Sequence, residues 1–525
     1  MLSNPSAQTN TESIITLPAR KQMYSQIALG TLTGLVHSGC LALIGVVLSP
    51  ILISRLGVAG YGTWVFLTSL TSYLNLFELG LSTALAKLWG EYRSTPDLPR
   101  LKSGATSAIT LLTVIGALAV TMTFVAARRW PDTLTLLPYF TVGTILMLWG
   151  EPIAGILRGL DRPHWVNLTG TASTIFNAGL IVWLLLVGWG LEALALALVA
   201  SSGLRLVSLA VLLRQAIPGG RLFHRPNLGI LREMLKLGAT DQITRVWVVV
   251  ISPTNRIVLY SILGSSVLTA YDLGSRLVSA IALIPAVMLP TLLPAFSRLG
   301  RDKDAVGIDN LLRRATRYMG LMSLPICVFL LVFADPIVTA WISWPSPDIA
   351  LATRILLVGA FINLMTGPFA QMLLGLGRPS LCVKKIIIGC VLGLSVPTVL
   401  AVMLGLSGFL IGESLAAAVP AIIFLWMFRG MTGFAALQFI MRTTCRITLA
   451  LIPPIGLLLL VYRITLFDPA WRSLWAWCWL FAVFLAGGLA TFWPTGVLTV
   501  EEIGKLFWTL RLPRLLPRLN QRSGQ

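Results

Sequence analysis

Long apolar runs, separated by short polar or basic segments, follow one another along most of the chain. A membrane-spanning helix needs about 20 mostly apolar residues, and runs of this length recur from residue 28 to residue 494. The pattern predicts an all-α polytopic membrane protein with about 14 transmembrane helices. The expected spans are 28–53, 60–86, 104–126, 134–157, 165–187, 190–213, 237–262, 267–297, 318–342, 349–376, 382–404, 407–428, 446–465 and 473–494.

The spans group into two sets of six and a final pair. Val500, Ile503, Phe507 and Leu510 share one helical face after the last span, which is typical of an amphipathic helix on a membrane surface. The expected parts are a flexible cytoplasmic tail at 1–24, an N-terminal six-helix bundle at 25–213, a cytoplasmic connector at 214–236, a C-terminal six-helix bundle at 237–428, two additional transmembrane helices at 446–494 and a cytoplasmic tail at 495–525.

The composition agrees with lipid as the main solvent. The chain has 525 residues, of which 56% are hydrophobic and 11% are charged, whereas soluble domains carry about 25% charged residues. The six cysteines are scattered without a CxxC pair, so neither a metal site nor a disulfide framework is indicated, and no cofactor is expected. The net charge of +20 is spread over many short loops, which does not favour nucleic acid as a partner.

The basic residues predict the orientation of the chain in the membrane. With the N-terminus inside, 30 Lys and Arg residues fall on the inner side and five on the outer side. Cytoplasmic loops carry the excess of Lys and Arg in membrane proteins. We therefore expect a multi-pass protein of the bacterial inner (plasma) membrane with both termini in the cytoplasm.

An internal repeat relates the two six-helix sets. Residues 151–163 read EPIAGILRGLDRP and residues 367–379 read GPFAQMLLGLGRP, with seven matches at an offset of 216. Two shorter matches are Gly190-Leu191 with Gly405-Leu406, and Leu56-Gly57 and Tyr61 with Leu263-Gly264 and Tyr271. Because each set has an even number of spans, the two bundles are expected to be related by a pseudo-two-fold axis along the membrane normal. Such repeats place a substrate site between the halves in many transporters.

Several segments resemble a known group of transporters. The first two spans contain LSPILISRLGVAGYGTWVFLTSLTSYLNLFELGLSTALAK, and the seventh and eighth contain SPTNRIVLYSILGSSVLTAYDLGSRL and then LPTLLPAFSRLG. Together with the GLxRP loops, residues 25–430 resemble the polysaccharide or O-antigen flippases of the multidrug/oligosaccharidyl-lipid/polysaccharide (MOP) exporter superfamily. The resemblance departs at Thr254-Asn255-Arg256, near which many relatives carry an acidic residue.

The resemblance implies a V-shaped transporter that works by alternating access. Its implied cargo is a polyprenyl-diphosphate-linked oligosaccharide, moved from the cytoplasmic to the periplasmic leaflet for lipopolysaccharide, O-antigen or exopolysaccharide synthesis. Membrane lipids, a polysaccharide polymerase and chain-length machinery are the implied partners. In the related lipid II flippases, two extra C-terminal helices form a groove for the lipid tail.

Charged side chains inside the spans are the candidate site, because a charge at mid-bilayer costs about 2.5–3.5 kcal/mol on insertion scales. Our hypothesis is that Arg245, Arg256 and Arg276 line a water-filled cavity and bind diphosphate oxygens. On one continuous seventh helix, the first two would share a stripe with Asp241. The alternative is that Asp241–Arg245 and Asp272–Arg276 are neutralising pairs within one helix. The substrate-binding candidates are Arg245, Arg256, Arg276, Asp241, Asp272, Glu78, Asn75 and Glu151.

His37 lies in the first span and is a candidate for proton coupling, although a lone hydrogen-bonded histidine is the more common case. Arg205 and Arg354 lie nearer helix ends, where their side chains can extend to the interface. A multidrug exporter of the same superfamily is the alternative function. A membrane-embedded polysaccharide polymerase or ligase is less favoured, because the expected outer loops are very short and no phosphate-binding loop or nucleophile motif occurs. We therefore expect a transporter and not an enzyme.

Overall fold

The structure is a computed structural model, and it describes residues 17–78, 80–91, 98–129, 134–217, 224–246, 250–343, 346–464 and 474–492. All regular elements in these ranges are helices, which confirms the all-α prediction. The N-terminal residues 1–16 and the expected amphipathic tail at 495–525 lie outside the described residues.

Nine helical segments in the described part of the chain are long and apolar enough to cross a membrane. Two of them exceed one span: α1 (Leu17–Ser72) has 56 residues and α15 (Ser380–Thr432) has 53. A helix of 53 residues is about 80 Å long, whereas the hydrocarbon core is about 30 Å thick. Non-helical residues, Gly57 in α1 and Gly405 in α15, divide each into two spans. With these divisions, the described helices correspond in order to the predicted spans.

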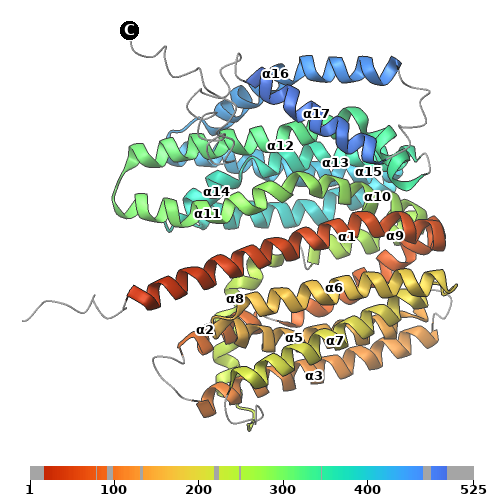
Figure 1. The fold of residues 1–525 in the computed structure, drawn as a ribbon, viewed down its shortest axis with the longest axis vertical. Helices are drawn as coiled ribbons and strands as arrows, with labels where there is room; N and C mark the ends of the chain where they lie inside the picture. Colours follow the sequence, from red (N-terminus) through yellow and green to blue (C-terminus); the bar gives the residue numbers. More distant parts are fainter. Residues whose placement is uncertain are drawn as a thin grey trace, which may run out of the picture. The chain divides into compact units, whose positions relative to one another are not determined.

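The chain divides into two compact units, and the first contains residues 1–269. In it, α5 packs against α2, α3 and α7, and α8 packs against α2 and α3 (Figure 1). A core around Trp89, Leu157 and Met234 joins these helices. The remaining elements of this unit are η1 (Tyr73–Glu78), α2 (Leu81–Gly90), α3 (Leu98–Arg129), α5 (Leu137–Gly159), α6 (Pro163–Leu186), α7 (Glu192–Ala216), α8 (Leu228–Val246) and α9 (Ser252–Leu263).

The second unit contains residues 270–525. Here α13 packs against α15, α11 packs against α14, and α16 packs against α12 and α17. Phe296, Phe369 and Phe428 are fully buried in its core. The elements are α10 (Ser265–Ser279), which begins in the first unit, η4 (Ala280–Ala282), α11 (Leu283–Arg301), α12 (Ala305–Ile342), α13 (Pro347–Leu364), α14 (Gly367–Gly375), α15, α16 (Ala436–Ile464) and α17 (Leu474–Phe492).

The two GLxRP loops have the same backbone conformation. In the first, Arg162 N donates to Leu157 O at 2.9 Å, and in the second Arg378 N donates to Leu373 O at 2.8 Å. The residue before each arginine is left-handed: Asp161 has a φ of 58° and Gly377 has a φ of 71°. The sequence repeat therefore encodes one turn that ends a helix and starts the next.

The shorter echo is also structural. Gly57 (φ 71°, ψ 171°) and Gly264 (φ 85°, ψ 179°) adopt a conformation that is open to glycine and strained for other residues. Each follows a leucine and lies between the first and second spans of one of the two six-span sets. The sequence paired Tyr61 with Tyr271 as well, at a different offset, and both side chains are buried.

Close helix crossings are repeated too. A methyl group on Gly159 would lie 2.5 Å from Ala86 O and 2.8 Å from Trp89 Cβ. A methyl group on Gly375 would lie 3.0 Å from Leu293 O and 2.8 Å from Phe296 Cβ. Each crossing joins the helix before a GLxRP loop to the end of the second helix of that half. The duplication thus extends from the loops to helix packing.

Several expected spans are not single α-helices. The span at 267–297 comprises α10, η4 and α11, and the span at 349–376 comprises α13 and α14. The span expected at 60–86 contains the 3₁₀ segment η1. In the span expected at 237–262, α8 runs to Val246, α9 begins at Ser252, and residues 250–251 are π-helical. Interruptions of this kind occur in membrane helices where they are buried in protein or line a cavity.

Candidate functional site

The second span, which contains η1, and the seventh span, which contains the π-helical residues 250–251, contact each other at two places. At one contact the Tyr73 hydroxyl and Thr254 Oγ1 are 2.6 Å apart. At the other, Gly80 has a φ of 68°, and a methyl group on it would lie 2.6 Å from the Cα of Gly238. Both contacts lie within the first unit. We call the stretch of both spans between these contacts the interrupted segment.

The interrupted segment is longer on one span than on the other. Gly80 comes seven positions after Tyr73, while Thr254 comes sixteen positions after Gly238. The seventh span therefore contributes more residues between the two contacts than the second span does.

Most sequence-predicted site residues of these spans lie in or next to this segment. Asn75 and Glu78 belong to η1 and are half-buried, and the Asn75 side-chain amide donates to Ser72 O at 3.0 Å. Arg256 is half-buried in the first turn of α9 beside the buried Asn255. Polar side chains therefore lie close to the stretches where the backbone departs from regular α-helix.

Asp241 and Arg245 lie on α8 within the same segment, but their side chains are outside the described residues. The hypothesis that Arg245 and Arg256 share a stripe assumed one continuous helix. The structure assigns Arg245 to α8 and Arg256 to α9, with π-helical residues at 250–251, so a uniform 100° spacing does not describe the whole stretch. A common stripe of the two arginines, and lining of a cavity by either, stay predictions.

Asp272 and Arg276 are on α10 in the second unit, where they form the pair that the alternative interpretation described. Arg276 Nε donates to Asp272 Oδ2 at 2.8 Å. The Asp272 side chain is 2% exposed and that of Arg276 is 28% exposed. On the preceding residue, the Tyr271 hydroxyl lies 3.4 Å from Glu413 Oε1 of α15. The carboxylate is thus committed to the pair, while part of the guanidinium stays accessible.

Glu151 belongs to a cluster that the sequence did not predict. Its carboxylate accepts from Arg205 at 2.9 Å and lies 3.8 Å from Arg158. Arg158 also donates to Ser82 Oγ at 2.9 Å. Two guanidiniums therefore face one carboxylate among α2, α5 and α7. Glu151 lies eight residues before the end of α5, and Arg205 lies eleven before the end of α7, so their similar depth could have suggested the pair.

His37 is placed at a contact between α1 and α6. Its Nδ1 lies 3.2 Å from Thr171 Oγ1, and a methyl group on Gly170 would lie 2.9 Å from its ring. The imidazole therefore has a hydrogen-bonding role between two helices. A role in proton coupling stays a prediction.

Two further cations of the second unit have partners inside the protein. Arg354 donates to Leu331 O at 3.1 Å and pairs with Asp335. Lys385, expected at an inner helix end, donates to Thr366 Oγ1 and lies 5.6 Å from the centre of the Phe424 ring. In the described part of the chain, no three His, Cys, Asp or Glu side chains are close enough to hold a metal ion.

Comparisons with known proteins agree with this architecture. Residues 165–344 match the family described as "Polysaccharide biosynthesis protein". No curated protein matches the chain in sequence. The family match covers the end of the first unit's repeat, the connector, and the beginning of the second.

Solved transporter structures share the fold. The lipid II flippase MurJ in an inward closed conformation has 13% identity and a TM-score of 0.67, covering 93% of this chain and 99% of its own. An inward-facing multidrug resistance MATE family transporter of the MOP superfamily has 16% identity and a TM-score of 0.57, covering 78% and 98%. A MOP superfamily transporter from Pyrococcus furiosus, whose reversed pocket polarity was taken to suggest a different function, has 15% identity and a TM-score of 0.53, covering 77% and 95%.

Proposed function

We propose that this chain, a multi-pass membrane protein that has the fold of the MOP superfamily of flippases and exporters, is a flippase for a lipid-linked oligosaccharide. The substrate would be a polyprenyl-diphosphate-linked glycan, carried from the cytoplasmic to the periplasmic leaflet for cell-surface polysaccharide synthesis. In the proposed orientation both termini are in the cytoplasm of a bacterial cell, and a polysaccharide polymerase and chain-length machinery act on the product.

The interrupted segment of spans two and seven supports this proposal most directly. It brings amide, carboxylate and guanidinium side chains into the membrane at Asn75, Glu78 and Arg256. Charged residues inside spans are costly and usually face a partner or a water-filled cavity. An arginine forms two parallel hydrogen bonds with a phosphate group, and amides and carboxylates bind sugar hydroxyls. A diphosphate-linked sugar headgroup needs both kinds of contact.

The mechanism follows from the two contacts that bound this segment. The Gly80–Gly238 contact holds the spans close together, and the Tyr73–Thr254 hydrogen bond holds them at the other end. We propose that α8 and α9 reorient relative to each other between these contacts while the headgroup passes. Arg256 and Arg276 would bind the diphosphate, while the lipid tail stays in the bilayer.

Complementation in a strain that depends on this protein tests the proposal. Arg256→Ala and Arg276→Ala should each lower surface polysaccharide at least tenfold at normal protein levels, since each removes a charge-assisted contact to phosphate. Arg314→Ala is the matched control, because Arg314 is an exposed arginine on α12. Unchanged polysaccharide in both test variants would refute the proposed roles.

A multidrug exporter is the second candidate, because MATE transporters share the fold. Hydrophobic cations would favour a site dominated by carboxylates, whereas arginines are prominent in the spans of this chain. Drug efflux from a sensitive strain distinguishes the two functions. Export that persists after Arg256→Ala, together with normal polysaccharide, would favour the exporter.

A further inference from the structure

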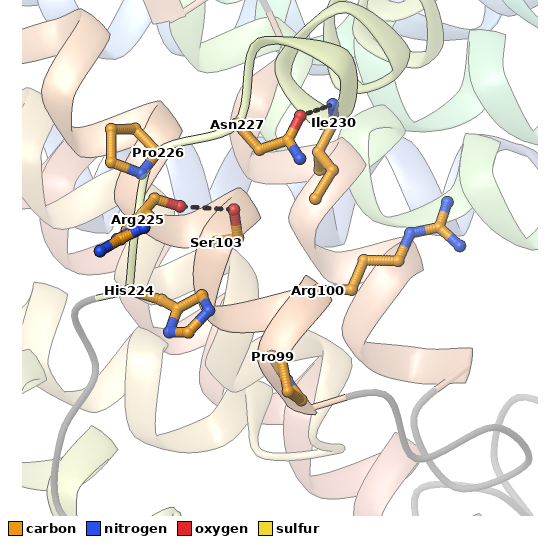
Figure 2. A pocket seen from close by; sticks show the side chains of 8 residues that line it. All are labelled: Pro99, Arg100, Ser103, His224, Arg225, Pro226, Asn227 and Ile230. Atoms are coloured by element: carbon orange, nitrogen blue, oxygen red, sulfur yellow. Dashed lines mark hydrogen bonds between the residues drawn. The ribbon is translucent and has the colours of Figure 1, made fainter.

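A second polar site lies in the first unit, where the connector reaches α8. A pocket of about 530 Å³ opens here between the start of α3 and residues 224–227. Among the described residues, its lining contains two arginines, a histidine, a serine and an asparagine, and none of these lining residues is acidic. The lining residues are Pro99, Arg100, Ser103, His224, Arg225, Pro226, Asn227 and Ile230 (Figure 2).

Hydroxyl groups on one face of α3 fix the backbone of this pocket. Ser103 Oγ donates to Arg225 O at 2.7 Å, Thr106 Oγ1 accepts from His224 N at 3.0 Å, and Ser107 Oγ accepts from Asn227 N at 2.8 Å. Three successive polar groups of the connector are thereby used, so its path along α3 is set. The side chains of His224 and Arg225 are left exposed on a fixed backbone.

The second wall is joined to the first by an ion pair. Arg100 of α3 donates to Glu233 of α8 at 2.8 Å. Asn227 Oδ1 accepts from the backbone N of Gly229 at 2.8 Å and caps the start of α8. The Glu233 carboxylate is thus bound to Arg100, and the cap does not use the Asn227 side-chain NH₂ group.

The Arg225 guanidinium and the His224 ring form no hydrogen bond or ion pair with another side chain in the part of the chain that the structure describes. In Figure 2 the His224 ring projects from the connector toward Pro99 and Arg100, and the Arg225 side chain extends from the same segment of the connector. The pocket therefore presents guanidinium, imidazole and amide donors, without a carboxylate among the described residues of its lining.

We propose that this pocket binds the phosphate or diphosphate group of a lipid at the inner leaflet. A phosphate group accepts several hydrogen bonds at once and matches the planar donors of an arginine. In the proposed orientation, basic loops lie on the cytoplasmic face, where anionic lipid headgroups are found. Because residues 224–227 lead directly into α8, a bound headgroup would fix the start of the seventh span. The site is separate from Asn75, Glu78 and Arg256.

Native mass spectrometry of the purified full-length protein tests the proposal. Phosphatidylglycerol, a polyprenyl diphosphate and sodium pyrophosphate are titrated separately. The Arg225→Gln variant should retain a phosphate-bearing lipid about tenfold less than the wild type, since a charge-assisted pair contributes about 1.5–3 kcal/mol. His224→Gln should have a smaller effect in the same direction. The lipid whose binding falls more in Arg225→Gln is identified as the source of the phosphate. Competition by pyrophosphate would show that the phosphate group itself is recognised.

Arg232→Gln is the matched control, because Arg232 is an exposed arginine of α8 outside the pocket lining. It loses the same charge and should bind lipid as the wild type does. Arg225→Lys keeps the charge but loses the planar donors, so its affinity should fall between those of the wild type and Arg225→Gln. Equal losses in Arg225→Gln and Arg232→Gln would overturn the proposal, as would lipid retention in Arg225→Gln equal to that of the wild type. Neither result bears on polysaccharide transport, which is measured separately.

Discussion

The two units share backbone features but differ in their buried charges. Both have a GLxRP turn and a close glycine crossing before it. At the offset of 216, however, Glu151 of the first unit corresponds to Gly367 and Arg158 corresponds to Leu374. The second unit has its own buried pair, Asp272 and Arg276, on a different helix.

This difference distinguishes residues that both halves need for folding from residues that serve one half only. The duplicated positions are glycines and prolines that set turns and allow helices to approach, so they serve both halves equally. Buried ion pairs contribute little net stability, because desolvation offsets much of the attraction. Charges that occur in one half only are therefore better explained by function, or by an asymmetric response to substrate, than by folding.

The largest effect is expected from Glu151→Gln. It leaves the Arg205 guanidinium, 14% exposed, without its 2.9 Å partner, and the loss of one member of such a pair costs about 3 kcal/mol. The melting temperature of the purified protein should fall accordingly. The double variant Glu151→Gln/Arg205→Gln should recover much of the loss.

The exposed pair Asp309–Arg313 in the second unit is the control for this prediction. The two groups are 2.7 Å apart and their side chains are 43% and 47% exposed. Asp309→Asn should therefore cost less than about 1 kcal/mol. If Glu151→Gln were no more destabilising than Asp309→Asn, the cluster in the first unit would not be a distinctive feature.

The duplicated crossings predict equal sensitivity in the two units. Gly159→Ala and Gly375→Ala each insert a methyl group within 2.5–2.8 Å of a neighbouring helix, and overpacking of this kind costs about 2 kcal/mol. Thermal unfolding of the two variants should shift by similar amounts. Gly179→Ala is the control, because no atom lies within 4 Å of the new methyl group. Sensitivity of one copy alone would contradict the structural interpretation of the repeat.

A smaller effect is expected at the interrupted segment of the first unit. Tyr73→Phe removes the 2.6 Å contact with Thr254, and one neutral hydrogen bond contributes about 1 kcal/mol. Melting temperature measures the loss, and polysaccharide transport should fall several-fold if the contact holds the spans during transport. Tyr139→Phe removes a hydroxyl from an exposed tyrosine on α5 and should change neither quantity. Wild-type transport in Tyr73→Phe would exclude the proposed role.

The smallest effect is expected from His37→Gln. Glutamine can still form a hydrogen bond with Thr171, as the imidazole does at 3.2 Å, but it does not titrate. Transport should stay within about twofold of the wild type, because glutamine keeps the hydrogen bond with Thr171 that the structure shows for His37. Loss of transport with normal protein levels would instead support proton coupling by His37.

Residues that dictate backbone conformation made much of the fold predictable. Pro163 and Pro379 begin the helices after the two loops, or lie just before them, and the glycine or aspartate two residues earlier takes a positive φ. These effects are local, so a short sequence motif predicts them. The apolar runs likewise predict the spans, because the thickness of the bilayer sets a minimum length for each of them.

The candidate site was less predictable, because it depends on contacts between distant residues. The segment YLNLFE contains neither glycine nor proline, yet it forms the 3₁₀ element η1. Glu151 and Arg205 are 54 residues apart, and only their similar distance from the ends of α5 and α7 links them. Residues 250–251 of the seventh span are π-helical, which an assumption of one regular α-helix did not anticipate.

The contact between Gly80 and Gly238 has a practical consequence for protein engineering. Gly80 cannot gain a side chain, since even a methyl group on it would lie 2.6 Å from the Cα of Gly238. Asn75 and Glu78 lie on the preceding 3₁₀ segment η1. A library designed to redirect the protein to another glycan can therefore randomise these two positions and Arg256, while both glycines are kept unchanged.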